Sequence, residues 1–198
     1  MNRSPVPNQR AIIDRRLLAG RIAELVTEHG SKARPQIVQA LKEALDAGRA
    51  ELTRRLCERP SAGHACTRGH AFLIDQLVRV LYDHVTADLY PAPNRSSAER
   101  LAILAVGGYG RAEMAPHSDV DIAFLTAQRH TPWCEQVIEA MLYLMWDLGL
   151  KVGHSSRTIE DSMRLARADL TIRTSLLEAR YVWGDEALYD EASRRFWS

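Results

Sequence analysis

One stretch constrains the fold more than any other: residues 101–125 contain two apolar runs separated by a glycine-rich break and a polar segment. The first run, Leu-Ala-Ile-Leu-Ala-Val, is typical of a buried strand, and Gly107 and Gly108 end it. Asp119 directly precedes the second run, and Asp121 lies within its start, two positions further on. Two short apolar strands joined by such a segment predict part of a sheet, and the polar residues at the junction predict a site on it.

The spacing of Asp119 and Asp121 carries the chemistry. Successive side chains of a strand alternate between faces, so both carboxylates point the same way while Val120 and Ile122 point into the core. Two ionised carboxylates on one face repel each other unless a hard cation lies between them, and Mg²⁺ is commonly bound by one or two carboxylates plus substrate phosphates. We therefore predict that Asp119 and Asp121 are the catalytic metal ligands.

The glycines predict the other half of the site. Gly107 and Gly108 have no Cβ, so backbone N–H groups there can approach a phosphate. The turn that begins at Tyr109 is predicted to offer a helix N-terminus to the same anion. Arg111 and Ser118 add a guanidinium and a hydroxyl, both suited to phosphate oxygens. We predict that Gly107, Gly108, Arg111 and Ser118 hold a nucleoside triphosphate.

A Gly-Gly turn followed by Asp-x-Asp on a strand resembles the nucleotidyltransferase superfamily with the polymerase-beta type of fold. The resemblance extends further. Residues 107–122, followed by 146–158 and 169–171, are similar to the amino-terminal domain of the bacterial PII uridylyltransferases, and residues 75–79 and 47–51 are similar to that family's helical leader. The resemblance therefore spans most of the chain.

This resemblance implies an α/β (α+β) fold with a small mixed sheet and a helical amino-terminal leader. It implies Mg²⁺-dependent transfer of UMP from UTP to a tyrosine of the signalling protein PII, with release of pyrophosphate. It also implies that UMP removal belongs to a later HD domain and glutamine sensing to ACT domains. The motif itself leaves the acceptor open, so transfer to another small molecule or protein, or an inactive nucleotide-binding domain, are the alternatives.

Lys151 departs from the pattern that the resemblance implies. Many relatives bring a third carboxylate from a neighbouring strand, and a glutamate often stands where this chain has Lys151. A protonated lysine cannot bind Mg²⁺, although it can neutralise triphosphate charge if it faces the site. The other interpretation is that Lys151 lies on the solvent face.

Composition limits the remaining function classes. The chain has 198 residues, of which 46% are hydrophobic, enough for one substantial core and a helical appendage. Its 26 basic and 25 acidic residues give a formal charge of +1, which does not suggest a nucleic-acid partner. Three widely spaced cysteines do not resemble a secreted disulfide framework, and no signal peptide or membrane-length apolar run is present. These features predict a soluble cytoplasmic protein.

The periodicity of apolar residues predicts the domain organisation. Residues 1–9 are expected to be a mobile tail and 10–90 a helical leader, with helices ending near Gly30 and Pro60 and a third over about 71–89. A proline-rich linker at 91–97 precedes a nucleotidyltransferase domain over 96–198. Since the chain stops at apolar Phe196 and Trp197, we expect this domain to be truncated at its carboxy-terminal end.

Two cysteines and two histidines lie within fourteen residues: Cys57, His64, Cys66 and His70. A zinc site is the specific interpretation, but these residues lack the paired close spacings typical of structural zinc. The glycines and serine among them favour a plain loop over residues 61–70.

Overall fold

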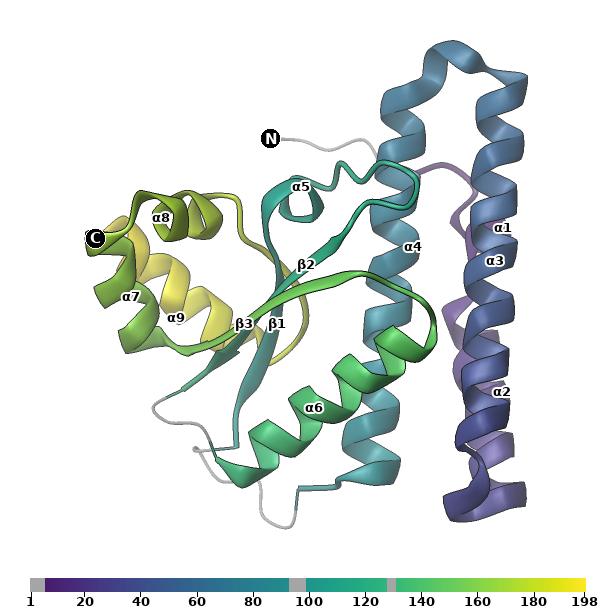
Figure 1. The fold of residues 1–198 in the computed structure, drawn as a ribbon, viewed down its shortest axis with the longest axis horizontal. Coiled ribbons are helices and arrows are strands. Elements are labelled where there is room, and N and C mark those ends of the chain that lie inside the picture. Colours follow the sequence, from purple (N-terminus) through teal and green to yellow (C-terminus); the bar gives the residue numbers. More distant parts are fainter. Residues whose placement is uncertain (1–5, 93–98, 128–130) are drawn as a thin grey trace. The chain divides into compact units, whose positions relative to one another are not determined.

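The computed structural model describes residues 6–92, 99–127 and 131–198 (Figure 1). Contacts divide the chain into a helical unit, Met1–Val80 with Ala112–Ser118, and a sheet unit, Leu81–Arg111 with Asp119–Ser198. Residues 1–5 of the predicted tail and residues 93–97 of the predicted linker lie outside the described residues. Within the described ranges, no helix combines the length and apolar character that crossing a membrane requires.

In its described residues, the helical unit contains four α-helices, and short 3₁₀ turns follow the second and the third. In chain order they are α1 (Gln9–Ile12), α2 (Arg15–His29), a turn at Gly30–Lys32, α3 (Arg34–Glu58), a turn at Pro60–Ala62 and α4 (Gly63–His84). The last turn of α4 belongs to the sheet unit and continues into a π-helical segment, Val85–Leu89. Asp14 separates α1 from α2, because its carboxylate accepts from the N–H groups of Arg16 and Leu17 and caps α2.

Two glycines allow close packing of the long helices. A Cβ at Gly48 of α3 would lie 2.6 Å from Leu73 Cδ1 of α4, and one at Gly69 of α4 would lie 2.3 Å from Leu52 Cδ2 of α3. Both distances are shorter than real Cβ contacts. The absence of side chains at these positions therefore lets α3 and α4 approach each other.

The prediction of a plain loop over residues 61–70 is wrong, because α4 begins at Gly63. Cys66, Gly69 and His70 are buried and continue the apolar stripe that Leu73 and its neighbours form along α4. Burial of this face outweighs the low helix propensity of glycine and threonine. His64, Cys66 and His70 therefore all lie on one helix.

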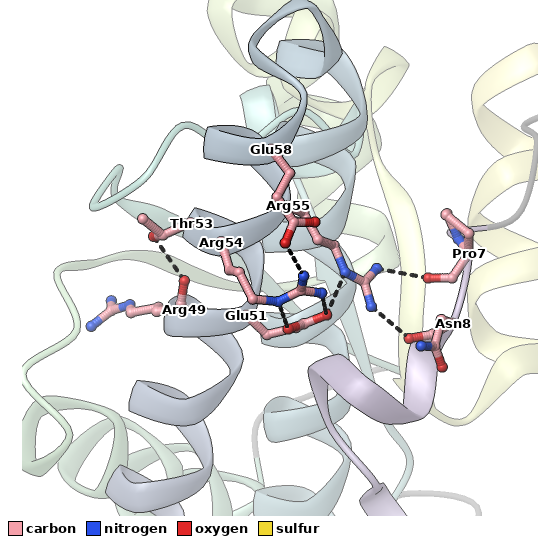
Figure 2. Close-up of polar contacts among 8 residues, drawn as sticks. All are labelled: Pro7, Asn8, Arg49, Glu51, Thr53, Arg54, Arg55 and Glu58. Carbon is pink, nitrogen blue, oxygen red and sulfur yellow. Dashed lines mark hydrogen bonds and ion pairs between the residues drawn. The ribbon is translucent and has the colours of Figure 1, made fainter.

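Figure 2 shows how α3 holds the segment before α1. The Arg55 guanidinium donates to the carbonyl oxygens of Pro7 and Asn8 at 2.8 and 2.9 Å. Its Nε donates to Glu51 at 2.7 Å, and Arg54 bonds to the same carboxylate from the neighbouring position. These two guanidinium groups lower the pKa of Glu51 to about 2. Arg55 is therefore held in place by its own helix while it anchors residues 7 and 8.

The sheet unit contains four strands and five helices within the described ranges, the last turn of α4 and the π-helix aside. Their bounds are β1 (Leu101–Ala105), α5 (Gly107–Gly110), β2 (Val120–Thr126), α6 (Pro132–Asp147), β3 (Val152–Thr158), α7 (Ile159–Ala168), α8 (Leu170–Leu177), β4 (Arg180–Gly184) and α9 (Glu186–Trp197). The strand order is β3-β2-β1-β4, with β2 and β3 parallel and the other pairs antiparallel. The predicted α/β fold with a small mixed sheet is confirmed.

One face of the sheet packs against α7 and α9, which Figure 1 shows grouped with α8, apart from α6. The buried residues of this packing are Ala102, Leu104, Leu125, Ile159, Met163, Leu188 and Ala192. Leu125 and Asp121 have the same parity in β2, so the Asp121 side chain belongs to this face, at the start of the strand.

Two features of the sheet unit differ from the sequence predictions. β4 and α9 were not predicted. The short helix after β1 begins at Gly107, not at Tyr109, because Gly107 adopts a left-handed φ of 59° that turns the chain directly out of the strand.

Candidate functional site

Asp119 and Asp121 lie where β2 begins. Val120 and Ile122 are buried, whereas Asp121 is half-buried and Asp119, just before the strand, is exposed. The start of β2 therefore shows the alternation that the sequence predicts, although the face that carries Asp121 is buried further along the strand at Leu125. The two carboxylates are near enough to interact electrostatically.

The electrostatics of the pair are unfavourable for two negative charges. Burial raises the pKa of the Asp121 carboxyl above its ordinary value, and the charge of Asp119 raises it further. A site that raises a carboxyl pKa in this way favours a proton or a cation at that position. The oxygen donors of two aspartates fit a hard divalent cation.

The glycine turn lies directly beside Asp121. Val106, the residue before Gly107, donates its N–H to the Asp121 carbonyl oxygen at 3.0 Å, which continues the β1–β2 ladder. A Cβ at Gly107 would lie 3.3 Å from Asp121 Oδ2. Gly107 and Gly108 form the first turn of α5, where N–H groups have no partner within the helix itself.

Residues 178–180, which run from the end of α8 to the first residue of β4, hold this turn in place. A Cβ at Gly110 would lie 2.3 Å from the carbonyl oxygen of Glu178, so the turn and this connection are in close contact. The Glu178 carboxylate pairs with Arg111 at 2.6 Å, and Arg180 donates to the Tyr109 carbonyl oxygen at 3.2 Å. The Arg180 guanidinium also lies over the Tyr109 ring, 5.3 Å from its centre.

Arg111, Ser118 and Lys151 are all exposed. Arg111 belongs to the sheet unit, where it pairs with Glu178. Ser118 belongs to the helical unit and donates its N–H to the Ala115 carbonyl oxygen at 3.1 Å. Lys151 directly precedes β3, and its carbonyl oxygen accepts from the Val120 N–H at 2.8 Å.

Three residues of this region were not identified from the sequence. Glu178 and Arg180 contact the glycine turn from about seventy positions away, and no local motif indicates such a contact. Gly153 pairs with Asp121 across β2 and β3. Its place in the register is visible only once the two strands are aligned.

No group of three or more His, Cys, Asp or Glu side chains is placed to hold a metal ion in the part of the chain that the structure describes. Asp119 and Asp121 are a pair, and the position before β3 contributes Lys151 instead of a third carboxylate. Cys57, Cys66 and Cys134 are free thiols, and the last two are buried.

Comparison with known proteins identifies the class to which this sheet and its carboxylate pair belong. The family model described as "Putative nucleotidyltransferase DUF294" matches residues 47–155, more than half of the chain. The chain belongs to this nucleotidyltransferase family.

More specific relatives are bifunctional uridylyltransferase/uridylyl-removing enzymes. Those of Erythrobacter litoralis and Novosphingobium aromaticivorans are 69% and 63% identical over 193 residues, and that of Rhodospirillum rubrum is 48% identical over 192 residues. These matches cover 96–98% of this chain but 20–21% of each relative. The resemblance predicted from the sequence is confirmed, and the chain spans about a fifth of the length of these relatives.

Proposed function

We propose that this chain is a Mg²⁺-dependent uridylyltransferase that moves UMP from UTP to a tyrosine of the PII signalling protein in the cytoplasm. The observation that carries the proposal is the carboxylate pair at the start of β2, with a half-buried Asp121 beside the glycine turn. The names of the relatives support uridylyl transfer. The identity of the acceptor follows from the family resemblance.

In the proposed reaction, the tyrosine oxygen forms a bond to the α-phosphorus of UTP while the bond from that phosphorus to the pyrophosphate oxygen breaks. Pyrophosphate leaves, and the phenolic proton passes to solvent. A bound Mg²⁺ would neutralise phosphate charge and lower the pKa of the attacking hydroxyl. Asp119 and Asp121 would hold this ion with their carboxylate oxygens.

The chain's own groups would position the nucleotide. Gly107 and Gly108 present backbone N–H groups without side chains in the way, and these are the groups we propose for the triphosphate. Arg111 would add its guanidinium, although binding phosphate would compete with its ion pair to Glu178. Ser118 would add a hydroxyl.

The test is to incubate the chain with PII, Mg²⁺ and UTP labelled at the α-phosphate, and to locate the label by mass spectrometry. We expect label on a PII tyrosine, together with stoichiometric pyrophosphate. ATP, GTP and CTP labelled in the same way serve as controls for the base. Label on a different acceptor would overturn the PII assignment, and no Mg²⁺-dependent pyrophosphate release with any acceptor would overturn transferase activity.

A further inference from the structure

The space around the Asp121 carboxylate is created by two glycines, Gly107 at the start of α5 and Gly153 in β3. The parallel register of β2 and β3 pairs Asp121 with Gly153, and paired residues of a ladder project to the same face. A Cβ at Gly153 would lie 2.4 Å from Asp121 Oδ1, well inside the roughly 3.0 Å that real Cβ atoms keep. A Cβ at Gly107 would lie 3.3 Å from the other oxygen, Oδ2.

The two glycines have different reasons to be glycine. Gly107 has a φ of 59°, a conformation that side chains disfavour, so its backbone alone explains the residue. Gly153 lies inside β3 and is not among the positive-φ residues of the described chain. A glycine weakens a strand, and an alanine at this position would suit the backbone better. What Gly153 provides is therefore the space that Asp121 Oδ1 occupies.

We propose that Gly153 is a positioning residue for the Asp121 carboxylate. Because position 153 has no side chain, the Asp121 carboxylate can extend from β2 over Gly153 of β3, on the face that the two residues share. It stays close to Asp119 there. A methyl group at 153 would force the Asp121 side chain to rotate out of this space, since a short side-chain end moves more easily than a strand backbone. This proposal rests on the proposed function, because it specifies how one metal ligand of that site is oriented.

The test uses Mn²⁺ alone as the probe, with binding measured by electron paramagnetic resonance, so that no turnover is needed. We expect the wild type to bind Mn²⁺, D121N to lose that binding, and G153A to weaken it by about tenfold or more. The Tm of G153A should stay within about 5 °C of the wild type, because the carboxylate moves and the sheet does not. In a transfer assay, G153A should require correspondingly more Mg²⁺ for half-maximal rate.

Gly20→Ala is the matched control. Gly20 lies on α2 with nothing within 4 Å of its Cβ position, so the same chemical change meets open space there. G20A should bind Mn²⁺ like the wild type. Wild-type Mn²⁺ affinity in G153A would overturn the positioning role and leave the proposed function intact. A Tm loss of more than about 5 °C in G153A would also overturn the positioning role, because it would mean that the methyl group displaces the strand and not the carboxylate. Mn²⁺ binding that is absent from the wild type, or unchanged in D121N, would overturn both.

Discussion

At the scale of single residues, the fold places the Asp121 carboxylate where its ionised form is unfavourable. Its pKa is raised on folding, first by burial and then by Asp119, so the stability that this carboxyl contributes is present at low pH and is lost as pH rises through the folded-state pKa. At neutral pH the ionised side chain opposes folding. A cation bound by both carboxylates would relieve this repulsion.

The first prediction follows from that conflict between stability and activity. Asp119→Asn and Asp121→Asn should each lower UMP transfer by about 10²-fold or more, because a charge that stabilises the transition state is lost. D121N should be at least as stable as the wild type at neutral pH, since it removes a repelled charge without changing shape. Transfer is measured with labelled UTP and stability by thermal unfolding. Near wild-type turnover in either variant would exclude that carboxylate as a metal ligand.

Lys151 gives a second prediction at this scale. Val120 pairs with Val152, so Lys151 precedes β3 at the level where Asp119 precedes β2. If its ammonium group contacts the triphosphate, Lys151→Glu should weaken UTP binding about tenfold or more, or make binding depend more steeply on Mg²⁺. Lys42→Glu on the exposed side of α3 controls for the change of charge. Equal UTP affinity and metal dependence in K151E and K42E would show that Lys151 is a bystander.

Residues whose place in the fold depends on local pattern were predictable. Asp119, Asp121 and Gly107 stand out because period-two alternation and a glycine break act over a few positions. Gly153 could not be identified in the same way, because its importance depends on the register between β2 and β3. Glu178 contacts Arg111, which is far from it in the chain, and a single sequence carries no signal for such a contact.

At the scale of elements, long amphipathic helices and apolar strands were predictable, whereas β4, α9 and the start of α4 were not. β4 has five residues, of which Val182 alone is buried, so its alternation is weak. Only two residues separate it from the end of α8. The start of α4 was missed for a related reason. Its first turns contain glycine and threonine, and they are helical because one face is buried.

An ion pair between Arg100 and Asp185 lies at the connection from β4 to α9. Asp185 caps α9 by accepting from the Leu188 N–H at 2.9 Å, and it bonds to Arg100 through both carboxylate oxygens at 2.6 and 3.0 Å. Hydrogen bonding to Arg100 lowers the pKa of Asp185, and the cap contributes in the same direction. Since the folded-state pKa is lowered, the stability from this carboxylate is fully present above the unfolded pKa of about 4 and is lost as pH falls through the folded value.

A third prediction separates the cap from the ion pair. Asp185→Ala removes both and should cost about 1–2 kcal/mol at neutral pH, whereas Arg100→Met keeps the cap and should cost less. Urea unfolding at neutral pH and at about pH 3 measures both effects. The difference between the wild type and R100M should shrink at the lower pH, because Asp185 becomes protonated. A difference that is constant with pH would mean that Arg100 acts through packing and not through charge.

At the scale of the whole molecule, the match to the nucleotidyltransferase family ends at residue 155, while β4 and α9 lie beyond it. These elements nevertheless complete the sheet unit: β4 pairs with β1, and its first residue, Arg180, donates to the Tyr109 carbonyl oxygen in the glycine turn. The relatives extend over the same region at high identity. The family motif therefore defines the chemistry, and the segment after it supports the geometry of the site.

The last prediction concerns the two activities that the relatives' names combine. The resemblance assigns UMP removal to an HD domain that follows the transferase domain in the longer proteins, and this chain corresponds to about a fifth of their length. Removal is hydrolysis of a phosphodiester and requires a positioned water, whereas the site proposed here is built around a nucleoside triphosphate. We expect the 198-residue chain to transfer UMP from UTP to PII, but to release no UMP from uridylylated PII in the presence of Mg²⁺ or Mn²⁺. Chromatographic detection of free UMP measures removal, and a phosphodiesterase confirms that the substrate can be cleaved. Release that increases with the amount of chain and survives in D121N would reveal a second hydrolytic site, and release that disappears in D121N would place both reactions at the carboxylate pair.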